Sequence, residues 1–237
     1  MSKRTINAED PRRAFLLKAL AAGLLAAGGL PGARAQFFGR KPQRLPAGQS
    51  IYEATGAVTV NGQAASAATR IGATDRIETG KGAQLIFVVG FDAFLVRENS
   101  RLELAGGGGI VNTLRLATGA LLSVFGAGTK QVVTATAATG VRGTGLYVES
   151  EPERSYVCTC YGEVLIAAVD DANVSERIVS RHHDAPRYVL QAGAARRIQP
   201  APFINHTDVE LALIEALVGR TPPFSLFDED YGGARRY

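Results

Sequence analysis

Cys158 and Cys160 are the only cysteines of the chain and the residues best suited to chemistry. They lie in the stretch Tyr156–Gly162, which has the composition of a strand. Residues two apart on a strand point to the same face, so the two sulfurs are expected to lie side by side. Their Cα atoms would be about 6.6 Å apart, at the upper edge of the separation that a disulfide tolerates. Two thiolates on one metal ion fit this geometry more easily, because each metal–sulfur bond adds about 2.3 Å of reach.

All three histidines of the chain follow the cysteines. His182 and His183 precede a predicted strand at 187–190, and His206 precedes a predicted helix. Adjacent residues on a strand face opposite sides, so at most one of His182 and His183 is expected to join the cysteines. A set of two cysteines and two histidines suits tetrahedral Zn²⁺, and copper also binds thiolate and imidazole well. The predicted ligands are Cys158, Cys160, His183 and His206, with His182 as a substitute.

The same residues leave other possibilities open. The cysteines can form a strained or redox-active disulfide, or remain as a buried pair of thiols. A cysteine nucleophile with His182 or His183 as base and Asp184 as the orienting group is a further alternative. No serine stands in a nucleophile elbow and no HExxH helix is present, so the sequence favours binding over catalysis.

The N-terminus has the three parts of a secretory signal. Arg12-Arg13, with Phe15, Leu16 and Lys18 behind the pair, resembles the twin-arginine export motif. An apolar run at 19–30 follows, too short for the roughly 20 residues that span a bilayer. Ala33-Arg34-Ala35 predicts cleavage before Gln36. We therefore expect a periplasmic or secreted protein whose mature chain has no membrane span.

The net charge of +4 lies entirely in the predicted signal peptide. Residues 1–35 hold six basic and two acidic residues, so the remainder is formally neutral. The charge of the mature chain therefore does not support an electrostatic phosphate-binding surface, and we expect no nucleic-acid partner.

The mature chain is predicted to be mostly β-structure. A linker at 36–50 leads into short alternating runs bounded by Gly, Asn, Asp or Ser about every ten residues, a spacing typical of an antiparallel sandwich or jelly-roll-like fold. Gly106–Gly109 is predicted to be a flexible loop. Gly140–Gly145 is predicted to be a sharp turn, and the alternative is an anion-binding nest beside Arg142. The short alternating runs, which we predict to be strands, lie at 57–60, 76–79, 83–89, 93–96, 101–104, 113–116, 120–124, 131–136 and 145–149.

One helix is predicted, at 208–218. Thr207 and Glu210 form a capping box, and Gly219 is a natural stop. The helix is apolar on much of its surface, so we expect it to pack on the sheet. The resulting boundaries are a β domain at 51–170, a β-rich extension with this helix at 171–218, and a tail at 219–237, in which Phe224, Leu226 and Phe227 are candidates for contact with the domain.

An ordered series of short motifs runs through 52–150: Gly56-x-Val58-x-Val60-Asn61-Gly62, Ile71-Gly72-x-x-Asp75-x-Ile77-x-Thr79-Gly80, Asn99-Ser100-x-Leu102-x-Leu104, Leu114-x-Leu116-x-x-Gly119-x-Leu121, and Val133-Thr134 to Ala138-x-Gly140-Val141-Arg142-Gly143-Thr144. In order and spacing the series resembles a FecR domain. The resemblance implies a periplasmic all-β domain, of a family whose best-known members relay iron-siderophore signals to a sigma factor. Those members have a cytoplasmic anti-sigma segment followed by a membrane span, whereas here the cytoplasmic portion would be about a dozen residues and the span a short signal, so we do not expect the regulatory role to be carried over.

The sequence therefore predicts an exported FecR-like binding or sensing module that acts on an envelope ligand or protein and holds a metal ion. The alternatives are a thiol- or metal-dependent envelope enzyme and a structural or adhesion component.

Overall fold

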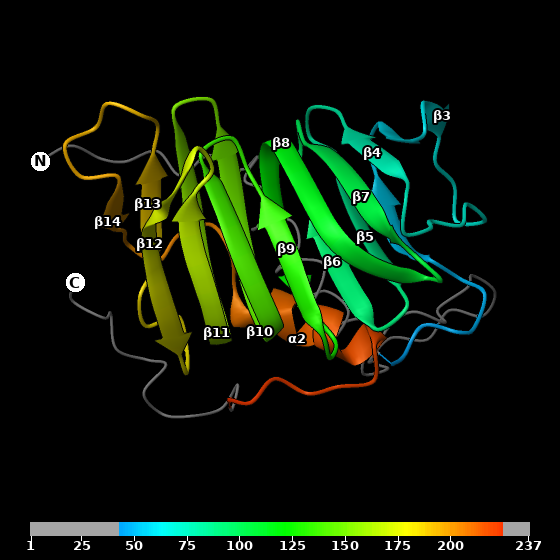
Figure 1. Ribbon diagram of the computed structural model, residues 1–237. Coiled ribbons are helices and arrows are strands. Elements are labelled where there is room, and N and C mark those ends of the chain that lie inside the picture. The colour runs from blue at the N-terminus through cyan, green and yellow to red at the C-terminus, as the bar shows by residue number, and fades with distance from the viewer. Residues whose placement is uncertain (1–42, 225–237) are drawn as a thin grey trace, which may run out of the picture. The chain divides into compact units, whose positions relative to one another are not determined.

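The computed structural model describes residues 43–224, which form fourteen strands and one helix (Figure 1). All of these strands and the helix lie in the unit that begins at Arg44. The predicted signal peptide and most of the predicted tail lie outside the described residues. The elements are β1 (Ile51–Thr55), β2 (Val58–Val60), β3 (Gln63–Ala64), β4 (Arg76–Thr79), β5 (Gln84–Val89), β6 (Asp92–Val96), β7 (Arg101–Gly107), β8 (Ile110–Val124), β9 (Thr129–Val133), β10 (Ala137–Glu151), β11 (Arg154–Ala168), β12 (Asp171–Ser180), β13 (Arg187–Leu190), β14 (Ile198–Pro200) and α2 (Asp208–Leu217).

Three long strands, β8, β10 and β11, connect two layers of sheet. Their halves 119–124, 145–151 and 154–161 belong to the order β1-β5-β6-β8-β10-β11-β13-β14, which we call the inner sheet. Their other halves belong to the order β3-β2-β4-β7-β8-β9-β10-β11-β12, the outer sheet. All neighbours are antiparallel except β8 and β9, which pair in parallel over three residues. The predicted all-β fold with one helix is thus confirmed.

Glycines lie where the long strands pass from one sheet to the other. Gly119 in β8 has φ 89°, and Gly162 in β11 has φ 91°, a region that L-residues with a side chain rarely adopt. A Cβ at Gly119 would also lie 2.6 Å from the Cα of Ser100. These positions therefore require glycine, and the bend at Gly162 begins just after Cys160.

The structure corrects three local predictions. Gly140–Gly145 is neither a sharp turn nor an anion-binding nest but an irregular part of β10, where the register with β11 shifts and Gly143 has φ 58°. Gly106–Gly109 closes the tight hairpin between β7 and β8 rather than a flexible loop. The runs predicted at 113–116 and 120–124 belong to one strand, because Gly119 bends β8 without ending it.

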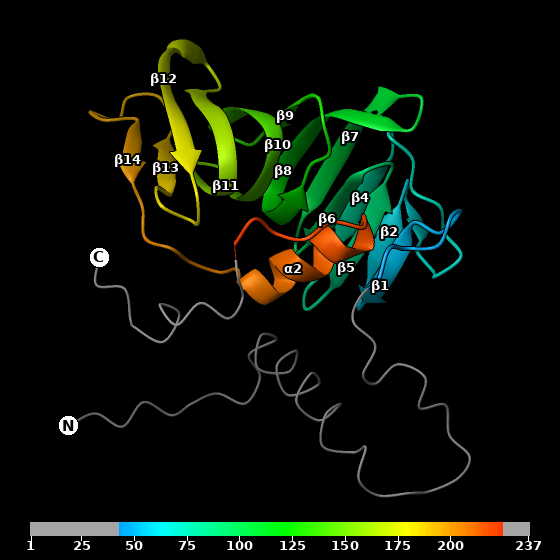
Figure 2. The ribbon, with the colours of Figure 1, turned by 90° about the horizontal axis from the view of Figure 1, so that it is seen from below.

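The side chains of the inner sheet alternate between two buried faces. Leu146 and Val157 point into the core shared with the outer sheet, whereas Tyr147 and Cys158 point to the opposite face. Figure 2 shows α2 lying along that opposite face, where it packs against β6 and β8. The inner sheet is therefore covered on both sides.

The helix begins where the sequence predicts and ends one residue earlier, with Val218 as its C-cap. Thr207 is the N-cap, its side chain accepts from the backbone N–H of Glu210, and Glu210 reaches back to the N–H of Thr207, which completes the capping box. Gly219 follows the C-cap with φ 75°. Over residues 43–224, no helix has the length and apolar character to cross a membrane.

Candidate metal centre

Cys158 and Cys160 lie side by side on the face of β11 that the C-terminal segment covers, as the strand alternation predicted. Both side chains have 0% exposure. The two sulfurs are not joined, so the structure contains a pair of thiols rather than the disulfide considered as an alternative.

His183 reaches the cysteines through a gap between two strands. Strand β12 pairs with β11 only from Gly162 onward, and β13 pairs with β11 only up to Val157. The loop that joins β12 to β13 crosses this gap, and the backbone N–H of His183 donates to the carbonyl of Cys160 over 3.0 Å. His183 has φ 55° there, a conformation that directs its ring onto the cysteines.

Asp184 shapes this loop and does not orient a histidine ring. Its carboxylate accepts from the backbone N–H groups of Arg181 (2.7 Å) and His182 (3.3 Å). The alternative in which Asp184 orients a catalytic histidine is therefore wrong, because its Oδ2 binds the loop backbone and the ring of His183 is held by Asp208 instead.

His206 enters the site from the segment that leads into α2. Its ring stacks on Tyr147 with 4.3 Å between ring centroids, and Phe203 packs against its edge. Its Nδ1 lies 2.7 Å from the carbonyl oxygen of Ile204. A carbonyl oxygen only accepts, so Nδ1 carries a proton and Nε2 points inward.

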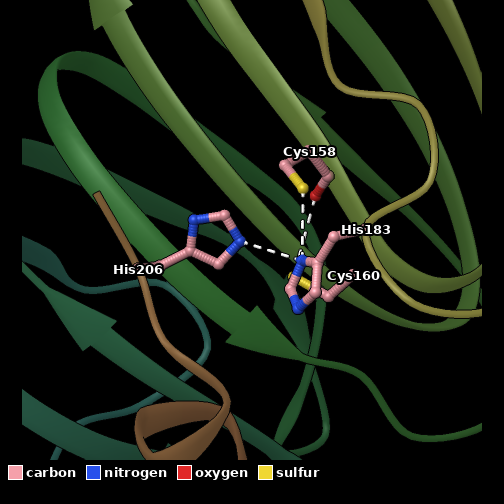
Figure 3. A group of neighbouring side chains, drawn as sticks. All are labelled: Cys158, Cys160, His183 and His206. Carbon is pink, nitrogen blue, oxygen red and sulfur yellow. Dashed lines mark hydrogen bonds between the residues drawn. The ribbon is translucent and has the colours of Figure 1, made fainter. Parts of the chain in front are cut away.

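The four predicted ligands come together in the interior (Figure 3). Their ligand atoms all lie within 4.8 Å of one another, close enough to hold a metal ion. Nδ1 of His183 lies 3.4 Å from the sulfur of Cys158 and 3.1 Å from Nε2 of His206. The four residues are spread over 49 positions of sequence, yet each has at most 4% exposure.

Asp208 fixes the orientation of His183. Its Oδ1 lies 2.8 Å from Nε2 of His183, and a carboxylate only accepts, so Nε2 carries a proton. Nδ1 of His183 and Nε2 of His206 then face each other at 3.1 Å, and when neither is protonated both present lone pairs. Two facing lone pairs repel unless a cation lies between them, either a shared proton or a metal ion. A carboxylate or carbonyl that holds the far ring nitrogen is the usual support of a metal-binding histidine.

The charges of the metal-free site follow from these contacts. Burial by itself raises the pKa of Cys158, but hydrogen bonds with Cys160, His183 and His206 hold that pKa well below its usual value. Burial, together with the neighbouring Cys158, raises the pKa of Cys160. Burial also opposes the imidazolium of His183, yet hydrogen bonds to Asp208 and Cys158 raise its pKa to about 9. In the metal-free site these contacts therefore favour a thiolate at Cys158 beside an imidazolium at His183.

His182 does not join the cysteines. Its Nε2 lies 2.8 Å from Oδ2 of Asp208, and its ring stacks on Phe224 at 4.3 Å. It thus flanks the same carboxylate as His183, and these three residues form a second group of potential ligands. Of the tail residues predicted to contact the domain, Phe224 does so, whereas Leu226 and Phe227 lie outside the described residues.

Sequence reasoning missed the role of Asp208. An aspartate at the start of a predicted helix is expected to stabilise the positive end of the helix dipole. That expectation accounted for Asp208 without predicting its contact with two histidines. The available signal was its position two residues after His206, in a helix N-terminus already linked to the site.

Comparisons with known proteins show limited similarity. No family model matches the sequence, and a search of curated proteins finds no match. Two crystal structures, at 1.65 and 2.50 Å resolution, of a "putative anti-sigma factor from Parabacteroides distasonis ATCC 8503" are similar to this chain, each with a TM-score of 0.44 and 12% identity. Each match covers 53% of this chain and 58% of the other, so the chain spans little more than half the length of those proteins. The FecR-like identity stays a prediction from the sequence motifs.

Proposed function

We propose that this protein is an exported, FecR-like binding or sensing module of the bacterial cell envelope that holds one zinc ion through Cys158, Cys160, His183 and His206. The observation that carries the zinc site is the pair of ring nitrogens at 3.1 Å, whose far nitrogens are each held by an acceptor, so that both can offer a lone pair to a metal ion once the proton between them leaves. Beside them lie two sulfurs that can bind as thiolates.

The donor set favours zinc. Two sulfurs and two imidazoles complete a tetrahedral coordination, which is typical of structural zinc sites with no open position for a substrate. The site is also buried, and the rings of Tyr147 and Phe203 pack against its two histidines. Two thiolates neutralise a divalent ion, whereas monovalent copper would leave a buried negative charge. Copper is the alternative that metal analysis distinguishes.

In this proposal the metal joins three parts of the chain. Cys158 and Cys160 belong to β11, His183 to the loop after β12, and His206 to the segment before α2. A metal bound by all of them fastens the C-terminal segment to the inner sheet, so metal binding and stability are linked.

A thiol-dependent envelope enzyme is the second candidate, because Cys158, His183 and Asp208 lie in the order of a nucleophile, a base and an orienting acid. The lowered pKa of Cys158, which hydrogen bonds maintain against the opposing effect of burial, fits this role. Its 0% exposure does not, since a substrate has no access to the sulfur. Rapid alkylation of Cys158 by iodoacetamide in the folded, metal-free protein would support the enzyme.

The proposal is tested by metal analysis of the full chain purified from cells. One equivalent of zinc is expected, and Cys160→Val should abolish it. Thr159→Val is the matched control: Thr159 is the neighbouring buried residue on β11, and its hydroxyl lacks a hydrogen-bond partner among the described residues, so its replacement should leave zinc content unchanged. A chelator should lower the melting temperature of the parent and of the control, but not of Cys160→Val.

The proposal would be contradicted if the purified protein carries no metal and neither zinc nor a chelator changes its melting temperature. A folded, metal-free protein with unreactive cysteines would point to the structural or adhesion role instead.

A further inference from the structure

The four proposed zinc ligands are closed off from solvent. Cys158 and Cys160 have 0% exposure, His183 has 4% and His206 has 3%. An ion therefore has no direct access from solvent to the sulfurs of the folded protein, and it must first pass the residues that surround them.

A second donor set lies next to the first and is partly open. His182, His183 and Asp208 offer ligand atoms within 4.8 Å of one another. The carboxylate lies between the two rings, with each Nε2 2.8 Å from a different oxygen. The side chain of His182 is 18% exposed, compared with 5% for His183 and 2% for Asp208, so an ion from solvent meets His182 first.

We propose that His182, His183 and Asp208 form a capture site that takes a divalent transition-metal ion from solvent and passes it to the cysteine-containing site. The inference rests on the proposed function, since it needs the inner site as the destination. Two imidazole nitrogens and a carboxylate bind such ions but lack thiolates, so an ion held there gains by moving inward to the sulfurs.

His183 belongs to both donor sets and can serve only one at a time. When Nε2 binds an ion in the capture site, the ring proton resides on Nδ1 and is donated to Nε2 of His206 over 3.1 Å. When Nδ1 binds an ion in the inner site, the ring proton resides on Nε2 and is donated to Asp208 over 2.8 Å. Each state leaves His183 with one proton and a hydrogen-bond acceptor, and the second proton of the His183 imidazolium and the thiol proton of Cys160 leave to solvent. Occupancy of the two sites is therefore mutually exclusive.

Phe224 covers the outer end of this route. Its ring stacks on His182 at 4.3 Å and lies 6.3 Å from the rings of His183 and Tyr161. In this proposal the ring of Phe224 shields one face of His182 from solvent and so limits the rate at which an ion is captured.

The test follows Co²⁺ uptake by the metal-free full chain in a stopped-flow instrument. Thiolate-to-cobalt charge-transfer absorption reports arrival at the cysteines and is silent for the capture site. His182→Phe keeps an aromatic ring against Phe224 and removes the nitrogen donor. Uptake should slow about tenfold or more. Release to a chelator should slow by the same factor, because a residue on the route changes both rates equally and leaves the equilibrium unaltered. Phe224→Ala, which uncovers the route, should accelerate both rates.

The outcomes separate the two ideas. Absence of the charge-transfer band in the unaltered chain refutes the zinc site itself. With the band present, an unchanged uptake rate in His182→Phe overturns the capture site. Slower uptake with unchanged release also overturns it, because that pattern means His182 only supports the Asp208–His183 bond.

Discussion

Replacing Asp208 with asparagine tests whether the carboxylate sets the tautomer of His183. Asp208 is buried and accepts one N–H from each of two histidine rings at 2.8 Å. The asparagine amide has a single oxygen, so its NH₂ group must face one of the two ring N–H groups. His183 can relieve that clash by moving its proton to Nδ1, which removes the lone pair that the metal needs.

The expected loss follows from the role of such a partner. Removing the group that orients a metal-binding histidine weakens metal affinity about 10- to 100-fold, equivalent to about 1.4–2.8 kcal/mol. In the metal-free protein, the lost charge-assisted hydrogen bond should lower the free energy of unfolding by about 1.5–3 kcal/mol. Zinc affinity is measured by competition with a chromophoric chelator, and stability by urea melts in the presence of a chelator.

Thr207→Ala provides the matched control. It removes the N-cap of the same helix turn at a cost of about 1 kcal/mol, but leaves the carboxylate and His183 in place. Its zinc affinity should equal that of the parent. The reasoning is refuted if Asp208→Asn binds zinc as tightly as the parent, or if Thr207→Ala weakens binding to the same extent.

Three further predictions concern export, pH and the bends of the strands. Arg12→Lys with Arg13→Lys should leave unprocessed precursor in the cytoplasm, and immunoblots of fractionated cells that show normal maturation would contradict twin-arginine export. Burial alone lowers the pKa of His183, but hydrogen bonds to the neighbouring carboxylate and thiol raise it to about 9. A raised folded-state pKa stabilises the metal-free fold fully below about 6.5, and this stabilisation is lost as the pH rises to about 9; urea melts of the parent and of His183→Gln should converge over that interval, and a constant difference would count against it. Gly119→Ala should lower the free energy of unfolding by about 1–3 kcal/mol more than Gly62→Ala. Both glycines have positive φ, but only Gly119 lacks room for a Cβ. Equal unfolding free energies of the two variants in urea melts would show that this crowding is unimportant.

Rules that depend only on residues close together in the sequence, such as strand alternation and helix capping, predicted much of the site and the fold. Strand alternation was enough to place Cys158 and Cys160 on one face, because the side-chain period of a strand does not depend on what surrounds it. The helix ends at Thr207 and Gly219 were also predictable, since caps are satisfied within a few residues. The split of the β8 region into two strands was wrong because a glycine inside a bent strand has the same local signature as a turn.

The sequence by itself determined the composition of the site: the only cysteines and histidines of the chain, their order, and the shared face of the sulfurs. Only the tertiary structure decided which histidine joined them. His183 rather than His182 turns inward because the loop after β12 fills a gap in the pairing of β11, and pairing between distant strands is invisible in local sequence. The role of Asp208 was decided in the same way, since its contact with both rings requires α2 to lie across the inner sheet. Residue types and spacing set what chemistry is available, and long-range packing sets which atoms meet.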